Sequence, residues 1–270
     1  MDWVSFPGLG IGKIFLRDYA FEIFGLKIKW YSIILAFAIS VSICYSIVLA
    51  NKMAFKKEHL LDIIVVGLIF AIIGLRFYYV VFNWDYFSKN IIEIFNFRAG
   101  GLAIYGGIIF SVLAAYIYCK IKNIYFWTAL DISGVCFLLG QGIGRWGNFV
   151  NIEAYGVKTS LPWGMTSSKI PYYMQPVHPT FFYESVWCLL GFVLLNIFIK
   201  FFIKYKKFDG QIFLMYVSWY SFERFFVEGI RTDSLWLIKD FLRVSQVLSF
   251  VLFFASIFGI LYFGFSRKKN

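Results

Sequence analysis

Charged residues are scarce in this chain: they make up 15% of its 270 residues, while 60% are hydrophobic. Soluble domains contain about 45–50% apolar residues, so this composition excludes an ordinary soluble globular protein. Apolar runs of about 20 residues, the length needed to cross about 30 Å of hydrocarbon, recur along the sequence. We count seven of them, at roughly 31–50, 61–82, 102–119, 125–149, 180–199, 211–229 and 244–265.

Cysteine and histidine are also rare, with four and two residues. The cysteines lie in or beside apolar runs without a CxxC pattern, which argues against a disulfide framework or a zinc site. The HExxH, GxSxG and P-loop motifs are absent, so metal-dependent hydrolysis and serine-type acyl transfer have no support. We therefore expect no metal and no cofactor.

Acidic residues are fewer than basic ones, 15 against 26. No aromatic–basic nucleic-acid module is visible, so we expect no nucleic-acid partner and attribute the basicity to membrane lipids. The first, third and fifth loops and the C-terminal tail carry 12 Lys and Arg with few acids, and the alternate segments have mixed charge. The positive-inside rule then predicts an N-terminus outside and a C-terminus in the cytoplasm.

These patterns predict an all-α integral membrane protein with seven transmembrane helices and small extracytoplasmic loop elements. We expect an extracytoplasmic segment at 1–29, one membrane domain at 30–265 with an outer loop at 150–179, and a cytoplasmic tail at 266–270. Charges at Lys13, Arg17, Asp18 and Glu22 interrupt the first segment. We therefore interpret residues 1–29 as an interfacial helix or a loop, not as a cleaved signal peptide.

Three arginines, Arg76, Arg145 and Arg224, fall inside apolar runs. A charged side chain at bilayer depth is costly and usually faces a partner, a water-filled cavity or a ligand. The predicted orientation brings nearly all the intramembrane ionisable groups to the outer half of the membrane, with Asp131 as the exception. We therefore predict one polar pocket that opens to the outer leaflet and binds an anion.

The first motif of this pocket is Gly144-Arg-Trp-Gly-Asn-Phe-Val-Asn-Ile-Glu-Ala-Tyr-Gly156. Arg145 and Asn148 share a helix face, and the donor fork of an arginine matches a phosphate. The alternative is an Arg145 that Glu153 or another acid neutralises purely for packing. The second motif is a polar stripe on one helix, made of Tyr220, Arg224, Glu228 and Arg231. Its alternative is an Arg224–Glu228 pair that satisfies itself.

Two further motifs are less telling. Gly pairs flank Tyr105 in Arg98-Ala-Gly-Gly-Leu-Ala-Ile-Tyr-Gly-Gly107, where a turn followed by a tightly packed helix start is the alternative to a functional role. His178 precedes Pro179, a residue suited to the first turn of a helix, and a lone His there is more often a loop residue than a base. Glu184, inside the apolar run that follows, is expected to pair with an arginine of the pocket.

Taken in order, these motifs resemble those of the bacterial prolipoprotein diacylglyceryl transferase family. The resemblance rests above all on the Arg145 motif, and it extends from about residue 30 to the end of the chain. It implies a seven-span protein of the bacterial cell membrane with its active site facing the outer leaflet. It also implies transfer of a diacylglyceryl group from phosphatidylglycerol to the lipobox cysteine of prolipoprotein signal peptides, with a thioether formed and glycerol phosphate released.

The resemblance also implies roles for individual residues. Arg145 would grip the lipid head group, and Arg224, Glu228 and Arg231 would form a second essential cluster. We predict a catalytic set of Arg145, Arg224, Glu228, Glu153 and Tyr105. The predicted substrate-binding set is Arg145, Asn148, Asn151, Gly156, Tyr31, Arg76, Tyr220, Arg231, Glu184 and His178.

Tyr105 departs from the family pattern, because many members carry a His at that position, proposed to act as the base. A tyrosine with a pKa of about 10 is a poor proton acceptor. A carboxylate, water or the leaving phosphate then remains open as the acceptor of the thiol proton. Two other functions are also open. An anion or lipid transporter would suit intramembrane arginines and glycine-interrupted helices, but needs access from both faces. A non-catalytic lipid-binding subunit is the other.

Overall fold

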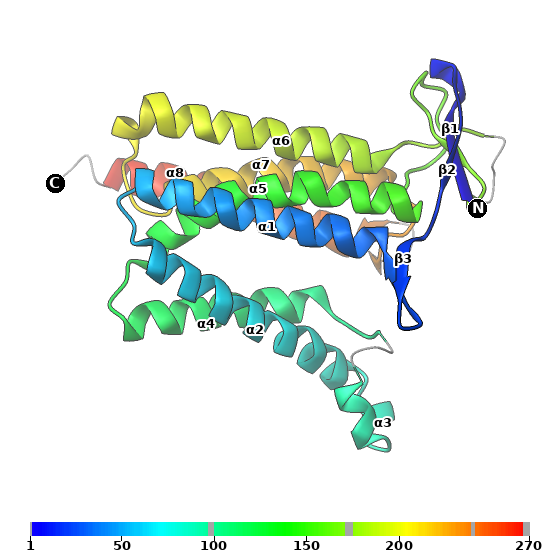
Figure 1. Cartoon of the computed structure of the whole chain (residues 1–270). Coiled ribbons are helices and arrows are strands. Elements are labelled where there is room, and N and C mark those ends of the chain that lie inside the picture. The colour runs from blue at the N-terminus through cyan, green and yellow to red at the C-terminus, as the bar shows by residue number, and fades with distance from the viewer. Residues whose placement is uncertain (1, 97–99, 171–174, 239–240, 267–270) are drawn as a thin grey trace. The chain divides into compact units, whose positions relative to one another are not determined.

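The computed structural model describes residues 2–96, 100–170, 175–238 and 241–266, and most of them are helical (Figure 1). Arg98 of the Tyr105 motif and residues 267–270 of the predicted cytoplasmic tail lie outside the described residues, as do Lys239 and Asp240. The helices are α1 (Trp30–Lys52), α2 (Lys57–Phe82), α3 (Trp84–Phe87), α4 (Ile104–Ile121), α5 (Phe126–Asn151), α6 (Thr180–Ile197), α7 (Gln211–Ile230) and α8 (Val244–Ser266).

Each of the seven predicted apolar runs coincides with a helix. In the part of the chain that is described, six helices are long and apolar enough to cross a membrane: α1, α2, α4, α5, α6 and α8. A helix suits lipid because it satisfies its own backbone hydrogen bonds. The remaining long helix, α7, has 20 residues but carries Glu223, Arg224 and Glu228, so its composition is more polar.

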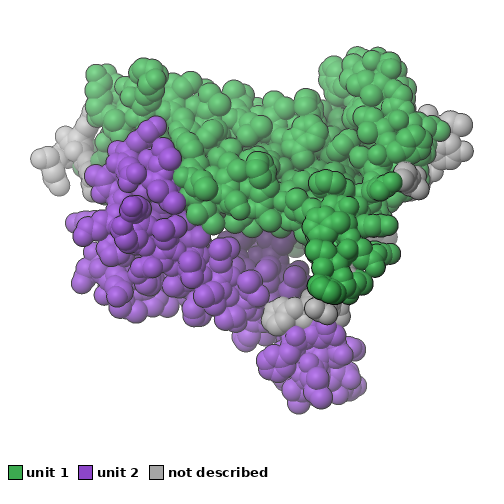
Figure 2. Space-filling model, viewed as in Figure 1, with its two compact units in different colours: residues 1–46, 131–270 green, residues 47–130 purple. Residues whose placement is uncertain are grey.

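The chain forms two compact units (Figure 2). Unit 1 contains residues Met1–Ser46 and Asp131–Asn270, and unit 2 contains Ile47–Leu130. In unit 2, α2 packs along α4, and their backbones meet at Gly74 and Gly106. A Cβ atom on Gly106 would lie 2.1 Å from the carbonyl oxygen of Gly74, so no larger residue fits this crossing.

In unit 1, α6 and α7 are joined by two tryptophans. The rings of Trp187 and Trp219 stack with their centroids 4.3 Å apart. Each indole N–H donates to the backbone carbonyl of the other residue, at 3.0 Å in both directions. Gly191 leaves room for the ring of Trp219, since a Cβ atom there would lie 2.3 Å from its Nε1.

The N-terminal segment contains strands, so the expectation of an interfacial helix or loop was wrong, and the fold is not purely α-helical. Strands β1 (Asp2–Phe6) and β2 (Ile11–Leu16) form a hairpin, and β5 (Thr166–Ser167) adds to the other edge of β1. β3 (Tyr19–Ile23) and β4 (Leu26–Lys29) form a second hairpin. Its turn, Phe24-Gly25, has φ of 49° and 76°, a geometry that the hairpin twist favours. β6 (Trp236–Ile238) pairs with β7 (Leu242–Arg243).

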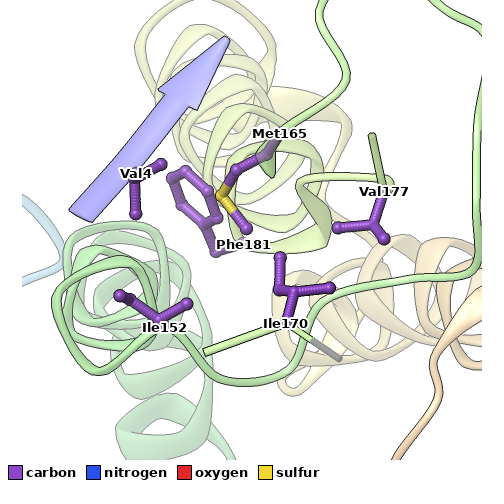
Figure 3. Close-up of a cluster of buried hydrophobic side chains, with 6 residues drawn as sticks. All are labelled: Val4, Ile152, Met165, Ile170, Val177 and Phe181. Atoms are coloured by element: carbon purple, nitrogen blue, oxygen red, sulfur yellow. The ribbon is translucent and has the colours of Figure 1, made fainter. Parts of the chain in front are cut away.

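A small apolar core ties the first sheet to the ends of α5 and α6 (Figure 3). It brings together residues from β1, from the segment between α5 and α6, and from the first turn of α6: Val4, Ile152, Met165, Ile170, Val177 and Phe181. All six are less than a tenth exposed. The β1–β5 sheet and this core therefore fix the segment that follows Arg145 against the start of the helix that carries Glu184.

Asp131, the ionisable residue that did not fit the predicted pocket, has a structural role in unit 1. Its carboxylate accepts backbone N–H groups from Gly210 at 3.0 Å and Phe213 at 2.9 Å, and it pairs with Lys206 at 2.9 Å. These donors lie at the N-terminus of α7, where backbone N–H groups lack partners within the helix. Asp131 on α5 thus caps α7 from a neighbouring helix.

Candidate active site

Two of the three arginines that fall inside apolar runs meet around one carboxylate in unit 1. Glu184, at 0% exposure on α6, lies 2.7 Å from Arg145 Nη1 through Oε2 and 2.7 Å from Arg224 Nη1 through Oε1. Arg224 also contacts Glu228, one turn on along α7, at 2.5 Å. The result is a chain of alternating charges that joins α5, α6 and α7, with both arginine side chains 18% exposed.

This network decides between the pairings that the sequence left open. Glu184 does pair with the arginines, and with two of them instead of one. The Arg224–Glu228 pair is present, but Arg224 is shared with Glu184 and so is not satisfied by its own helix alone. Glu153 does not take Arg145; it accepts a hydrogen bond from the Asn148 side chain at 2.8 Å.

Two tyrosines lie near Arg145, one on α7 and one on α1. The hydroxyl of Tyr220 on α7 lies 3.4 Å from Arg145 Nη2. On α1, the ring of Tyr31 packs so close to Gly147 that a Cβ atom there would lie 2.7 Å from it. Both tyrosines were predicted to line the site, and both lie in unit 1 beside or within one turn of Arg145.

The backbone after α5 turns sharply and is strained. The helix ends at Asn151, and Ile152 and Ala154 follow with φ of 55° and 57°. A β-branched residue rarely adopts this left-handed conformation. The buried side chain of Ile152 holds it there through the apolar core of Figure 3. Strain of this kind persists only where surrounding packing imposes it, and it often accompanies functional sites.

Gly156 lies where three segments meet. Its N–H donates to the carbonyl of His178 at 2.9 Å, and the next N–H donates to the carbonyl of Ile230 at 2.8 Å. A Cβ atom on Gly156 would lie 2.8 Å from His178 Cβ and 3.1 Å from the Ile230 oxygen. The glycine therefore allows the loop after α5 to pack between His178 and the end of α7.

His178 and Arg231 flank this junction. Burial lowers the pKa of His178, which keeps its ring neutral near pH 7. Its Nδ1 lies 3.1 Å from the hydroxyl of Tyr183. Arg231 follows α7 and is held by Asp233 through two hydrogen bonds, from Nε at 2.9 Å and from Nη2 at 2.7 Å.

Tyr105 and Arg76 belong to unit 2. Tyr105 is in the first turn of α4 and is 39% exposed, after a turn in which Gly100 and Gly101 have positive φ. Arg76 is buried and donates to the carbonyl oxygens of Ile94 at 2.8 Å, Gly100 at 2.8 Å, Gly101 at 3.1 Å and Glu93. These contacts hold the segment between α2 and α4. They border a cavity of about 290 Å³ lined by Arg76, Tyr79, Asn83, Tyr86, Phe87, Glu93, Gly100 and Gly101.

Sequence reasoning overlooked two residues near the network. Glu223 lies next to Arg224 and outside the predicted polar stripe, yet it is buried on α7. Arg243 follows the β6–β7 turn and donates to the carbonyl of Glu228. Glu223 could have been identified from the sequence, because it is an acidic residue within an apolar run. No local pattern identifies Arg243, because its contact depends on how α8 packs against α7.

The family model for prolipoprotein diacylglyceryl transferase matches residues 18–262. The chain belongs to this family. Three similar proteins, each named phosphatidylglycerol–prolipoprotein diacylglyceryl transferase, come from Finegoldia magna, Clostridioides difficile and Enterococcus faecalis. Their identities are 48%, 43% and 43%. The alignments cover 88%, 93% and 94% of this chain, and 92%, 97% and 92% of the respective relatives.

Membership of the prolipoprotein diacylglyceryl transferase family confirms the resemblance that the Arg145 motif suggested. With six long apolar helices in its described part, this transferase family member is a multi-pass membrane protein. Its ion network offers chemistry that suits an anionic substrate. Each guanidinium has five N–H donors, more than the described contacts to Glu184, Glu228 and Tyr220 use, so donors remain for a phosphate.

Proposed function

We propose that this chain transfers the diacylglyceryl group of phosphatidylglycerol to the thiol of a lipobox cysteine in prolipoprotein signal peptides. A thioether forms and glycerol phosphate is released. The observation that carries the proposal is the pair of arginines held on either side of Glu184, in a chain whose similar relatives bear this enzyme name. In this proposal, the phosphate binds the remaining N–H donors of the same two guanidiniums, next to the Glu184 carboxylate.

In this mechanism, the phosphate of the lipid binds Arg145 and Arg224 and competes with Glu184 for their donors. A thiolate attacks the glyceryl carbon, and the bond from that carbon to the phosphate oxygen breaks. Negative charge grows on the leaving phosphate, and oriented cations in a partly buried site stabilise such charge effectively. The attack is on the glyceryl carbon and not on phosphorus. The task of the protein residues is therefore to bind and orient the two reactants and to stabilise the leaving phosphate.

The remaining site residues have supporting roles in this proposal. Glu228 orients Arg224, and the Asn148–Glu153 pair shapes the turn after α5. Asn151, Gly156, His178 and Arg231 lie along the same turn and the end of α7, where substrate would be bound. Contacts of Tyr31 and Tyr220 with lipid, a role for Tyr105 in the reaction, and contact of Arg76 with the head group remain predictions.

We further propose that α7 is a seventh span, with the N-terminus outside and the catalytic residues facing the outer leaflet of a bacterial cell membrane. The polar side chains of α7 support this placement, because a helix that lines a polar site within the membrane has no need to be apolar on that face. The basic loops between α1 and α2 and between α6 and α7 support the orientation.

The test uses purified protein, phosphatidylglycerol and a synthetic lipobox peptide. We expect a peptide that carries the diacylglyceryl group as a thioether, with an equal amount of glycerol phosphate. Arg145→Ala and the charge-conserving Arg145→Lys should both lose activity, since binding of the phosphate needs the planar set of guanidinium N–H donors as well as the positive charge. A wild-type protein that moves anions or lipids across vesicles, without releasing glycerol phosphate, would establish the transporter function instead.

A further inference from the structure

Glu223 is a buried carboxylate on α7. The residue is 6% exposed, and neither of its carboxyl oxygens has a hydrogen-bond partner among the described residues. A buried carboxylate normally has hydrogen bonds or a counter-ion at contact distance, because its burial is otherwise costly. Such an exception within an enzyme site calls for an explanation in terms of the reaction.

The neighbourhood of Glu223 is the arginine network itself. On α7, Glu223 precedes Arg224, and helical geometry places it about 60° from Tyr220, on the flank opposite Glu228. Its charge interacts with those of Arg145 on α5, Glu184 on α6, and Arg224 and Arg231 at the end of α7. The thiol of Cys188, also on α6, lies within range of the same carboxylate.

The charges of the network balance without Glu223. Arg145 and Arg224 carry two positive charges, and Glu184 and Glu228 carry two negative charges at contact distances of 2.5–2.7 Å. Glu223 is therefore not needed to neutralise an arginine. Its charge interacts with both guanidiniums that would hold the phosphate, and the side chains of these two arginines are 18% exposed.

The proposed reaction also lacks an obvious acceptor for the proton of the substrate thiol. Tyr105 offers a phenol where many family members carry a His, and a phenol is a poor proton acceptor at neutral pH. A thiol attacks only as its thiolate. We propose that Glu223 is a catalytic residue that accepts the proton of the lipobox thiol while Arg145 and Arg224 hold the phosphate; this role rests on the proposed transferase function.

The step balances in atoms and charge. The S–H bond breaks and its proton moves to the Glu223 carboxylate, and the sulfur electron pair forms the new S–C bond. The C–O bond to phosphate breaks, and its electron pair stays on the phosphate oxygen. The proton then passes from Glu223 to the glycerol phosphate that leaves, which restores the carboxylate for the next cycle.

The test compares two nucleophiles in the full-length protein, reconstituted with phosphatidylglycerol. One peptide carries the lipobox cysteine, and the other carries selenocysteine, whose selenol is already ionised at neutral pH and needs no base. With the cysteine peptide, Glu223→Gln should lower kcat/KM by about 100-fold or more, the usual contribution of a general base. With the selenocysteine peptide, the same variant should retain most of the wild-type rate.

Two matched variants separate proton transfer from structure. Glu228→Gln removes one of the two carboxylates that hold Arg224 and should slow both nucleophiles to the same extent. Glu22→Gln, on an exposed position of β3, should change neither. Restored activity with the selenol also shows that the Glu223→Gln protein is folded and binds lipid.

Three outcomes overturn the role of Glu223. The first is full activity of Glu223→Gln with the cysteine peptide, and the second is an equal loss of activity with both peptides. The third is a His178→Gln variant that loses activity with the cysteine peptide and keeps it with the selenocysteine peptide, while Glu223→Gln is unaffected. The last result would make His178 the acceptor. These outcomes are distinct from failure of the proposed function, in which the wild-type protein forms no thioether or selenoether with either peptide.

Discussion

Glu184 bridges Arg145 and Arg224, the two arginines that the substrate phosphate is proposed to contact, so its replacement should affect lipid binding in a specific direction. A phosphate that contacts the same two guanidiniums lies within about 6 Å of the carboxylate, and two like charges at that separation repel by about 3 kcal/mol at an effective dielectric constant of about 20. Glu184→Gln removes this repulsion and keeps the size of the side chain.

Part of the gain is lost because the arginines are less well fixed. Ordering one long side chain on binding costs about 0.5–1.5 kcal/mol. The net effect should be tighter binding of phosphatidylglycerol by about tenfold or more, since about 1.4 kcal/mol corresponds to a factor of ten. The lipid-free protein should lose about 3 kcal/mol of stability, the lower end of the range for a buried ion pair that loses one partner, because Gln still accepts a hydrogen bond. Turnover should fall, because Glu184 no longer holds the guanidinium groups of Arg145 and Arg224 in position.

The assay is thermal unfolding in detergent, with phosphatidylglycerol or phosphatidylcholine added, together with calorimetric titration of a short-chain phosphatidylglycerol. Glu184→Gln should unfold at a lower temperature than the wild type in phosphatidylcholine, and phosphatidylglycerol should raise its midpoint by a larger increment. Glu22→Gln serves as the control for loss of an exposed acid. Unchanged or weaker binding of phosphatidylglycerol in Glu184→Gln would refute the placement of the phosphate between the two arginines.

Three other predictions concern the surroundings of the site. Gly156→Ala should reduce activity by at least about tenfold and lower the unfolding temperature, because its Cβ would approach the Ile230 carbonyl to 3.1 Å; unchanged activity in a stable protein would contradict this. Burial acts to raise the pKa of Asp233, but hydrogen bonds from Arg231 outweigh it and hold that pKa below 3.8. The stabilisation is thus complete above about pH 4 and is lost as pH falls through the lower folded-state pKa, so wild type and Asp233→Asn should converge in unfolding temperature only in strong acid. Tyr105→Phe should lower kcat/KM about tenfold if the hydroxyl bonds the phosphate, whereas a packing role predicts almost no loss on the same lipidation assay.

The helices were predictable because each apolar run is long, and lipid leaves a chain few alternatives to helix. The strands of residues 2–29 were not. They are four to six residues long, their exposed aromatic side chains blur the alternation that identifies a strand, and their turns depend on positive φ at Gly10 and Gly25. The short β5 strand was equally hidden, since its two residues pair with β1 from far along the sequence.

The arginine site was predictable in outline and not in its connections. Charge inside an apolar run identified Arg145, Arg224 and Glu184, because burial of charge in lipid demands a reason. Helical spacing alone proposed Glu228 as the partner of Arg224, and the tertiary packing of α6 against α7 adds Glu184 to it. The contacts of Arg76 could not be predicted from the sequence at all. Its carbonyl acceptors are arranged by the turn at Gly100 and Gly101, and no periodic pattern encodes a turn of that kind.

The reciprocal tryptophan pair has a consequence for how a phospholipid gains entry. A slide of α7 past α6 by one residue is about 1.5 Å of travel with about 100° of rotation, enough to break both indole bonds and unstack the rings. Because Trp187 and Trp219 lie within two turns of Glu184 and Arg224, this seam acts as a fixed wall of the site. At the level of these two rings, the α6–α7 side of the site is therefore closed to a phospholipid.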